Sequence, residues 1–261
     1  MRALTPRLVM LATLGAGLAT AGSARAQAIV HEEDLETPLQ PEDFRSPQNW
    51  AVELRFGPYA PEVDSEFSGT PASDRPYQRY FGSKHRVMAQ LEVDYQFFHA
   101  FGSAAVGVQL GYFRESATAP AADPATKSED RTTLTLWPVN LCLVYRMDVP
   151  ARLWKVPLVP YVKLGLGETI WAITDGNGEI ATRPAGGKGR GATPGWMGAV
   201  GLALMLDWID PASGRALDSE TGLNHTYVFI EGARFAASGL GRKKTLHVGD
   251  TTWLAGLLFE F

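Results

Sequence analysis

The chain has 261 residues, of which 45% are hydrophobic and 20% charged, and its formal net charge is -4. This mild acidity is a poor match for nucleic acid, which binds basic surfaces, so we expect no nucleic-acid partner. The only cysteine is Cys142, which excludes an intramolecular disulfide, and no segment after Ala26 has the roughly 20 apolar residues of a membrane-spanning helix.

The N-terminus has the pattern of a secretory signal peptide. Arg2 and Arg7 precede a charge-free stretch rich in Leu, Ala and Gly, and Ala24-Arg25-Ala26 is a small-x-small cleavage site. We therefore predict a signal peptide over residues 1–26. Residues 27–49 are polar and acidic, contain prolines and have no helical or strand period. We predict that they form a flexible periplasmic arm.

From Trp50 onward, apolar and polar residues alternate in a series of segments. Period-two alternation separates the two faces of a strand, whereas a helix would mix the two sets. The clearest segment is Val87–Phe97, where apolar residues form one face and Met88 joins four polar residues on the other. The expected strands cover approximately residues 50–59, 87–97, 103–113, 132–147, 161–171, 196–206, 226–235 and 253–261.

The fourth predicted strand carries an irregularity. Leu134 and Leu136 are out of phase with Leu141 and Leu143, and Pro138 lies between the two pairs. Proline cannot donate a hydrogen bond to the ladder. We therefore predict a β-bulge near Pro138.

The connections decide how these strands are arranged. Long connections follow the odd strands, as in 60–85 and 114–131, whereas the gap after the second strand is only 98–102. About eight strands, an even number, is typical of bacterial single-chain barrels. We therefore predict an all-β fold: a single antiparallel transmembrane β-barrel over residues 50–261, with long extracellular loops and both ends in the periplasm.

Aromatic residues fall near the ends of the predicted strands, as two interfacial belts would require. Trp137 lies mid-strand and has no place in this scheme. The expected outer belt consists of Tyr59, Tyr112, Trp171, Trp196 and Trp253. The expected inner belt consists of Trp50, Tyr95, Phe97, Tyr145, Trp208, Phe259 and Phe261.

The inward faces of the predicted strands carry charged and amide side chains. A barrel of about eight strands is just wide enough for side chains to fill it, and buried charges need partners. We expect an ion-pair network that closes the lumen, with a selective polar pore as the alternative. Glu231 is placed inward although both phases of its strand are apolar. The expected network consists of Glu53, Arg55, Gln90, Glu92, Asp94, Arg146, Lys163 and Glu231.

Four inward residues, Met197, Met205, Leu254 and Leu258, are apolar, and a partly apolar lumen could pass or hold a small hydrophobic molecule.

We expect no metal site, because the acidic residues around Asp175-Gly176-Asn177-Gly178 fail the calcium-loop order and are better explained as a hairpin tip. We also expect no cofactor and no enzymatic activity.

Basic residues gather in the predicted outer loops. Lipopolysaccharide presents phosphates at that surface, so these residues are candidate contacts for it. They are Arg183, Lys188, Arg190, Arg242, Lys243 and Lys244.

The last strand resembles the C-terminal assembly signal of bacterial outer-membrane barrels. Trp253, Leu257, Phe259 and Phe261 lie on one apolar face, with an aromatic residue at each end. The resemblance implies recognition by the barrel assembly machinery and insertion into the bacterial outer membrane.

Over residues 50–261 the pattern resembles the small outer-membrane β-barrels of Gram-negative bacteria. The segments Gly222–Phe229 and Leu136–Val139, with the terminal Phe261, are similar to a group of uncharacterised barrels known mainly from myxobacteria. This resemblance implies no catalytic residues.

We therefore expect a monomeric, non-enzymatic outer-membrane barrel with a structural or small-solute role and with outer-membrane lipid and lipopolysaccharide as partners. Two alternatives stay open: a narrow channel for small solutes, hydrophobic ones included, and a soluble periplasmic calyx of lipocalin type. In a calyx the apolar face of each strand would point inward.

Overall fold

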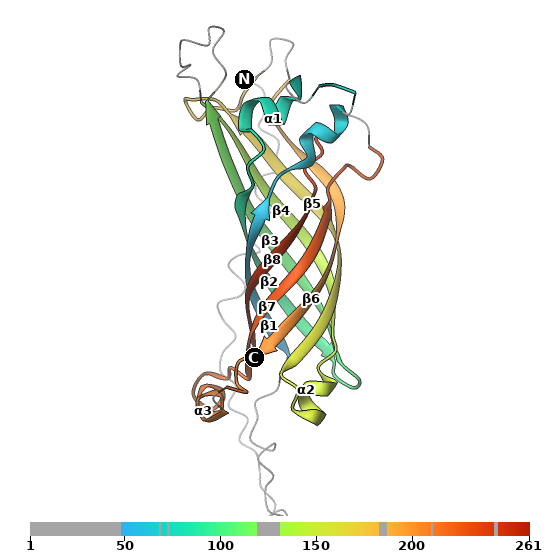
Figure 1. Cartoon of the computed structure of the whole chain (residues 1–261), viewed down its shortest axis with the longest axis vertical. Helices are drawn as coiled ribbons and strands as arrows, with labels where there is room; N and C mark the ends of the chain where they lie inside the picture. Colours follow the sequence, from blue (N-terminus) through green and yellow to red (C-terminus); the bar gives the residue numbers. More distant parts are fainter. Residues whose placement is uncertain are drawn as a thin grey trace, which may run out of the picture. The chain divides into compact units, whose positions relative to one another are not determined.

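A computed structural model describes residues 48–67, 69–71, 74–118, 131–182, 187–209, 211–242 and 245–261. Within these residues the chain forms a closed barrel of eight strands (Figure 1). Each strand pairs antiparallel with its sequence neighbours, and the last pairs with the first, which confirms the predicted fold class. The strands are β1 (Trp50–Tyr59), β2 (Arg86–Phe98), β3 (Ser103–Thr118), β4 (Arg131–Arg146), β5 (Leu158–Thr174), β6 (Arg190–Met205), β7 (His225–Ala236) and β8 (Asp250–Glu260).

The two ends of the barrel differ. At one end, here called the loop end, lie η3 (Glu62–Phe67), α1 (Pro76–Phe81) and the described connecting residues 175–182, 187–189, 237–242 and 245–249 (Figure 1). At the other, the turn end, lie the turn 99–102, α2 (Val149–Trp154), α3 (Pro211–Thr221) and Phe261. Sequence analysis missed the short helices, because six residues are too few to display a helical period. None of the described helices is long and apolar enough to cross a membrane.

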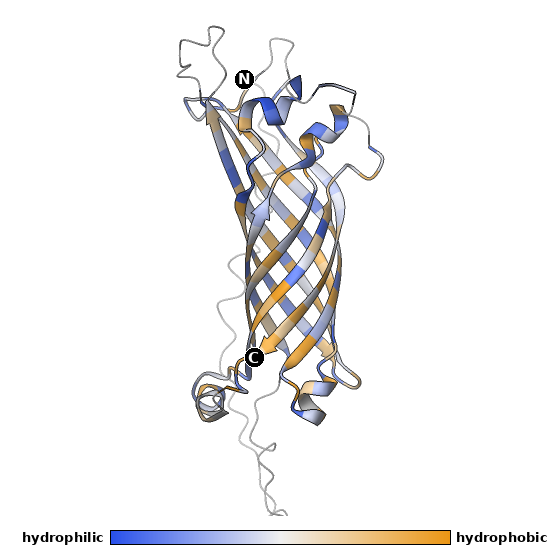
Figure 2. Cartoon of the chain, viewed as in Figure 1, coloured by the Kyte–Doolittle hydropathy of each residue, from blue (hydrophilic) through white to orange (hydrophobic). Residues whose placement is uncertain are grey.

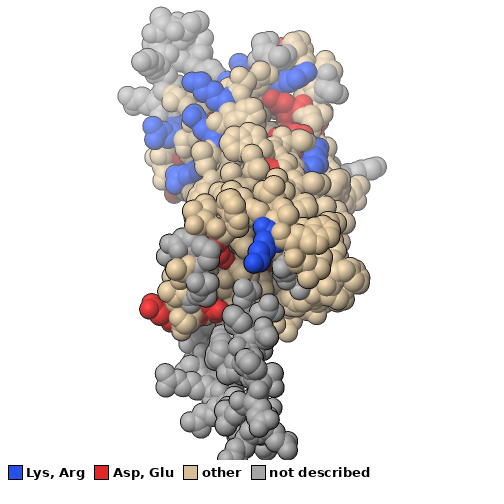
Figure 3. All heavy atoms as spheres, turned by 60° about the horizontal axis from the view of Figure 1, so that its bottom comes forward, with Lys and Arg blue, Asp and Glu red and all other residues tan. Residues whose placement is uncertain are grey.

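The alternation found in the sequence separates the inside of the barrel from its outer wall. Hydrophilic and hydrophobic residues follow each other along the strands (Figure 2). Large apolar side chains such as Val87, Leu166 and Val200 are about two-thirds exposed on the wall, at 68%, 66% and 67%. Viewed in Figure 3, charged atoms gather toward the two ends and a largely uncharged surface lies between them. The outer wall is therefore apolar over its middle.

The inside of the barrel has two parts. The paired charges around Glu53 and the buried Glu260 occupy the middle and the half nearer the turn end. Toward the loop end the interior is apolar and packed, with Tyr59, Phe113 and Leu136 almost fully buried. The edge-to-face contact of the Tyr59 and Phe113 rings, with centroids 5.1 Å apart, belongs to this apolar part.

The predicted bulge near Pro138 is wrong. The pairing of β4 keeps one register from Thr118↔Arg131 to Ser103↔Arg146 and, with β5, from Thr133↔Thr174 to Arg146↔Tyr161. The phase of the strand does not change; its inward side changes from polar to apolar. Leu134 and Leu136 therefore face the apolar part of the interior, not the wall. A register shift does occur in β2, between Gln96 and Phe98.

Two residues of the predicted outer belt also lie elsewhere. Tyr59 is 1% exposed and faces the interior, and Trp171 packs against the same apolar cluster. Both lie near a strand end, but their phase turns them inward. Trp137, which the sequence left unexplained, lies on the outer wall, where its ring centroid is 6.4 Å from that of Tyr112.

Candidate functional site in the barrel interior

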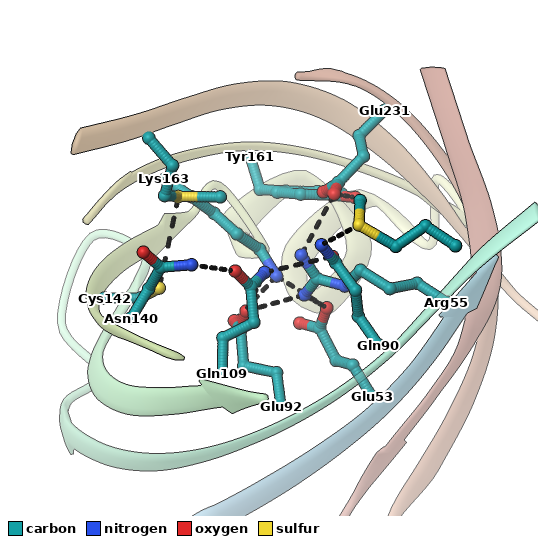
Figure 4. Close-up of polar contacts among 12 residues, drawn as sticks. Glu53, Arg55, Gln90, Glu92, Gln109, Asn140, Cys142, Tyr161, Lys163 and Glu231 are labelled. Atoms are coloured by element: carbon teal, nitrogen blue, oxygen red, sulfur yellow. Dashed lines mark hydrogen bonds and ion pairs between the residues drawn. The ribbon is translucent and has the colours of Figure 1, made fainter. Parts of the chain in front are cut away.

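The charged interior is built around β1. Glu53 and Arg55 are two residues apart, so both face inward, and Glu53 lies directly opposite Glu92 of β2. Figure 4 shows Arg55 and Lys163 reaching toward these two glutamates. Glu53, Arg55, Glu92 and Lys163 are each at most 1% exposed.

Arg55 connects three carboxylates. Its Nη1 donates to Glu231 Oε1 at 3.0 Å, and its Nη2 donates to Glu92 Oε2 at 2.8 Å and also to Glu53. The guanidinium carbon lies 5.7 Å from the centroid of the Phe229 ring. Arginine suits this position because its planar group can donate to several acceptors at once.

Two further bases complete the pairing. Lys163 Nζ donates to Glu53 Oε2 at 2.5 Å and to Glu92 Oε1 at 2.8 Å. Arg146 Nη2 donates to Glu53 Oε1 at 2.6 Å and to Asp94 Oδ2 at 2.5 Å. Glu53 therefore contacts all three buried bases and is the centre of the network.

Neutral side chains supply further hydrogen bonds to this network. Asn140 Nδ2 donates to Gln109 Oε1 at 2.8 Å, and Gln109 Nε2 lies 3.3 Å from both Gln90 Oε1 and Glu92 Oε2. The Tyr161 hydroxyl donates to Glu231 Oε2 at 2.9 Å. These contacts hold the carboxylates in fixed positions, as buried polar groups require.

Nearer the turn end, Glu260 accepts from neutral donors. Gln48 Nε2 and the Tyr227 hydroxyl donate to Oε2 at 2.5 and 2.9 Å, and Gln96 Nε2 donates to Oε1 at 2.9 Å. Gln48, which the sequence placed in the arm, is therefore bonded to the barrel. Residues 27–47 of the predicted arm and the whole predicted signal peptide lie outside the described residues.

All the residues proposed for the network face the interior, and the structure brings them together through shared contacts. Sequence analysis missed Glu260, Gln109, Asn140 and Tyr161 as members. The signal was present, because each lies in the inward phase of its strand. Glu260 is next to Phe261, and the sequence interpretation assigns this end of the strand to the assembly signal and not to the lumen.

Three carboxylates in this network lie close enough to suggest a cation site. Oxygens of Glu53, Glu92 and Asp94 lie within 4.8 Å of one another. Arg55, Arg146 and Lys163 already donate to them. A metal ion would have to displace these bases, so the donor set does not favour one.

The loop end of the barrel is covered by η3 and α1, here called the cap. Val63 and Tyr77 of the cap are buried in the apolar cluster. Asp64 accepts from the backbone nitrogens of Tyr77 and Gln78, at 2.7 and 2.8 Å, and so joins η3 to α1. The backbone nitrogen of Glu62 donates to the Gly249 carbonyl at 2.8 Å, which ties the cap to the connection before β8.

Tyr77 fixes the cap to the barrel wall. Its hydroxyl donates to Glu115 Oε2 at 2.5 Å, and Arg86 Nε pairs with Glu115 Oε1 at 3.0 Å. Burial of the phenol, and after it the hydrogen bond to Glu115, raise the pKa of Tyr77. The neutral phenol is thus favoured in the folded state. Its contribution is complete below the usual tyrosine pKa of about 10 and is lost only as pH rises beyond that value.

Tyr77→Phe should therefore release the cap at neutral pH. The lost bond to a carboxylate is worth about 1.5–3 kcal/mol. We expect faster amide hydrogen exchange in α1, by roughly tenfold or more. Tyr80→Phe, on the exposed side of the same helix, is the matched control. Equal exchange in the two variants would contradict this role for Tyr77.

The basic residues proposed as lipopolysaccharide contacts are only partly described. Lys188, Arg190 and Arg242 are exposed at the loop end, with Lys188 bridged to Thr182 in the hairpin before β6 and Arg190 at the first position of β6. Arg183, Lys243 and Lys244 lie outside the described residues.

The residues of the proposed assembly signal lie on the outer wall, and the strand closes the barrel. Trp253, Leu257 and Phe261 are 55%, 41% and 38% exposed, and Phe259 shares their outward phase. The Phe261 carbonyl accepts from the backbone nitrogens of Asn49 and Trp50 at 2.8 and 2.9 Å. The Phe261 nitrogen donates back to the Trp50 carbonyl at 2.8 Å.

Neither a protein-family model nor a curated protein matches this sequence. Among solved structures the chain is similar to Ail, the attachment invasion locus protein of Yersinia pestis, in complex with the heparin analogue sucrose octasulfate. That match has 11% identity and a TM-score of 0.40, and covers 82% of this chain and 97% of Ail. The chain is also similar to the outer membrane protein OprG from Pseudomonas aeruginosa, with 15% identity, a TM-score of 0.39, and coverage of 83% and 97%. The similarity to myxobacterial barrels stays a prediction.

Proposed function

We propose that the chain is a non-enzymatic, monomeric barrel of the bacterial outer membrane, with a structural role and a closed lumen. The observation that carries this proposal is the contrast between the two faces of the strands. The outer wall is apolar and exposed, whereas the interior holds paired charges in its middle and a packed apolar cluster toward the loop end. In lipid, strands can pair all their backbone N–H and C=O groups only in a closed barrel. An apolar outer wall is the surface that the lipid hydrocarbon requires.

Two successive layers support a closed lumen. The network around Glu53 occupies the middle, and the apolar cluster with its cap occupies the loop end. A cavity lined by residues including Tyr59, Asn140 and Phe235 has a volume of about 10 Å³. A single water molecule needs about that much space. A solute would therefore have to move side chains in both layers.

The test combines location with conductance. We expect the protein in the outer-membrane fraction, insoluble in sarkosyl, with heat-modifiable migration on a gel. In planar bilayers the folded protein should give no conductance steps. Regular steps would favour the narrow channel, and a soluble protein without a heat shift would favour the lipocalin-like calyx.

A serine and a histidine do meet at the loop end, but without the third group of a hydrolase. Ser65 Oγ lies 3.0 Å from His247 Nδ1, in an exposed contact. Glu66 accepts from the backbone nitrogen of His247, not from its ring. Within the described residues no carboxylate is bonded to that ring, whereas an activated serine needs a base oriented by a further group.

The loop-end bases provide a separate prediction about lipopolysaccharide. Replacing Lys188 and Arg242 together with Glu should weaken binding, because it replaces two positive charges by negative ones. The expected loss is only several-fold, since exposed ion pairs are individually weak and are screened by salt. Binding is measured on the folded protein by titration with purified lipopolysaccharide at low ionic strength. Lys155→Glu, at the turn end, is the control and should bind normally. If both variants bind lipopolysaccharide equally well, Lys188 and Arg242 do not contact it.

A further inference from the structure

We infer that the outer wall holds a binding site for a lipid headgroup that carries an ammonium group, formed by Glu168 of β5 between Trp137 of β4 and Trp196 of β6. This inference rests on the proposed membrane location and adds to it a ligand class that the basic loops would repel. The site lies where an acidic side chain interrupts the apolar wall.

Glu168 is part of the apolar wall. It is exposed, and its neighbours in the same outward phase of β5 are Leu166 and Ile170, which are 66% and 41% exposed. Directly opposite Glu168 lie Val139 of β4 and Pro194 of β6. Apolar residues therefore surround the carboxylate along its own strand and on both neighbouring strands.

This position of an acid is unique on the eight strands, all of which lie within the described residues. The other charged residues in the outward phase are arginines toward the loop end: Arg114, Arg131, Arg190 and Arg234. Arg234 is already paired with Glu62. Glu168 has neither a hydrogen-bond nor an ion-pair partner in the described part of the chain. An ionisable side chain in a membrane wall is costly, and it commonly marks a functional site.

Two tryptophans flank this carboxylate, one on each neighbouring strand. Trp137 pairs with Ile170 and Trp196 pairs with Leu166, so both are diagonal neighbours of Glu168 in the sheet. Diagonal neighbours are about 7–8 Å apart, which is within reach of an aromatic ring. Trp137 and Trp196 are 39% and 45% exposed on the wall. A small group bound at Glu168 can therefore contact both indole rings.

A carboxylate between indole rings selects an organic cation. The face of an aromatic ring is negative and attracts ammonium groups, quaternary ones included. Glu168 would repel a phosphate, and calcium takes about six to eight oxygen ligands, whereas this is the single outward acid of the strands. Tryptophan favours the boundary between hydrocarbon and headgroups. The site therefore fits the ammonium of a zwitterionic phospholipid whose acyl chains lie along the wall.

The inference is tested by native mass spectrometry of the full chain, folded in neutral micelles with EDTA present. Phosphatidylethanolamine is titrated, and the populations of free and complexed protein give the affinity for the first bound lipid. N-acetylated phosphatidylethanolamine keeps the phosphate and acyl chains but lacks the positive charge, so it should bind roughly tenfold more weakly. Phosphatidylcholine keeps a positive charge and should bind nearly as well as phosphatidylethanolamine.

Four single variants identify the residues of the site. Glu168→Gln should weaken the binding of phosphatidylethanolamine roughly tenfold, because it removes the charge that faces the ammonium. Glu179→Gln makes the same change on an exposed turn and should bind normally. Trp196→Leu should weaken binding several-fold, whereas Trp253→Leu, on the outward face of β8, should not.

The fold of each protein is checked first by its heat-modifiable migration. If folded Glu168→Gln binds phosphatidylethanolamine as tightly as the unsubstituted chain, or if the N-acetylated lipid binds as tightly as the parent lipid, the inference is wrong. If the unsubstituted chain never gives a heat-modifiable band, the proposed membrane location fails and the inference fails with it.

Discussion

Glu53→Gln is expected to lower the free energy of unfolding by about 3–5 kcal/mol, the usual cost of removing one partner from a buried ion pair. Glu53 is 1% exposed and accepts from Arg55, Arg146 and Lys163. Glutamine keeps the size of the side chain but removes the charge that these three bases share. Urea titration of the folded protein in micelles measures the change.

Two further variants separate the loss of charge from other effects of the substitution. Glu179→Gln makes the same chemical change on an exposed turn and should stay within about 0.5 kcal/mol of the native chain. Adding Lys163→Met to Glu53→Gln should restore part of the stability, because it removes one of the positive charges that Glu53 balanced while Glu92 keeps Arg55 as its partner. If Glu53→Gln alone is as stable as Glu179→Gln, the network does not stabilise the barrel.

Deleting Phe261 is expected to have the largest effect on assembly. The deletion removes three backbone hydrogen bonds between the end of β8 and the start of β1, at 2.8 to 2.9 Å. At about 0.5–1.5 kcal/mol each, their loss weakens the closure by about 1.5–4.5 kcal/mol. We expect most of the exported protein to lose its heat-modifiable folded form and to be degraded.

Phe261→Ala distinguishes the two functions of this residue. It keeps the backbone bonds to Trp50 and removes only the outward ring. If the ring is read by the assembly machinery, this variant fails in cells yet refolds into vesicles, whereas the deletion is impaired in both. Normal assembly of both variants in cells would contradict a signal at Phe261.

The lumen residues could be predicted because each is fixed by its own strand. Glu92 lies between apolar neighbours in a strict alternation, so its direction follows from the sequence alone, and the same holds for Lys163. Their partners could not be predicted. Arg55 contacts Glu231, which is 176 positions away in sequence, and that contact depends on the registers of every strand pair between them.

The apolar part of the interior was not predicted from the sequence, and Leu136 shows why. An apolar residue in the inward phase near the middle of a strand looked like a change of phase, so a bulge at Pro138 was predicted. In the structure β4 keeps its register, because Leu136 packs inside the barrel in one cluster with Phe113, Tyr59 and the cap residues. A side chain that is apolar and inward is interpretable only once its surroundings are known.

The sequence by itself determined the strands, their number and the contrast between an apolar wall and a polar interior, because alternation is a local property with a period of two residues. Only the tertiary structure decided which charges pair, which donors surround Glu260, and that Val63 and Tyr77 of the cap join the apolar cluster. These features join residues from distant strands and loops. Their geometry is fixed by barrel closure and register, which no single segment contains.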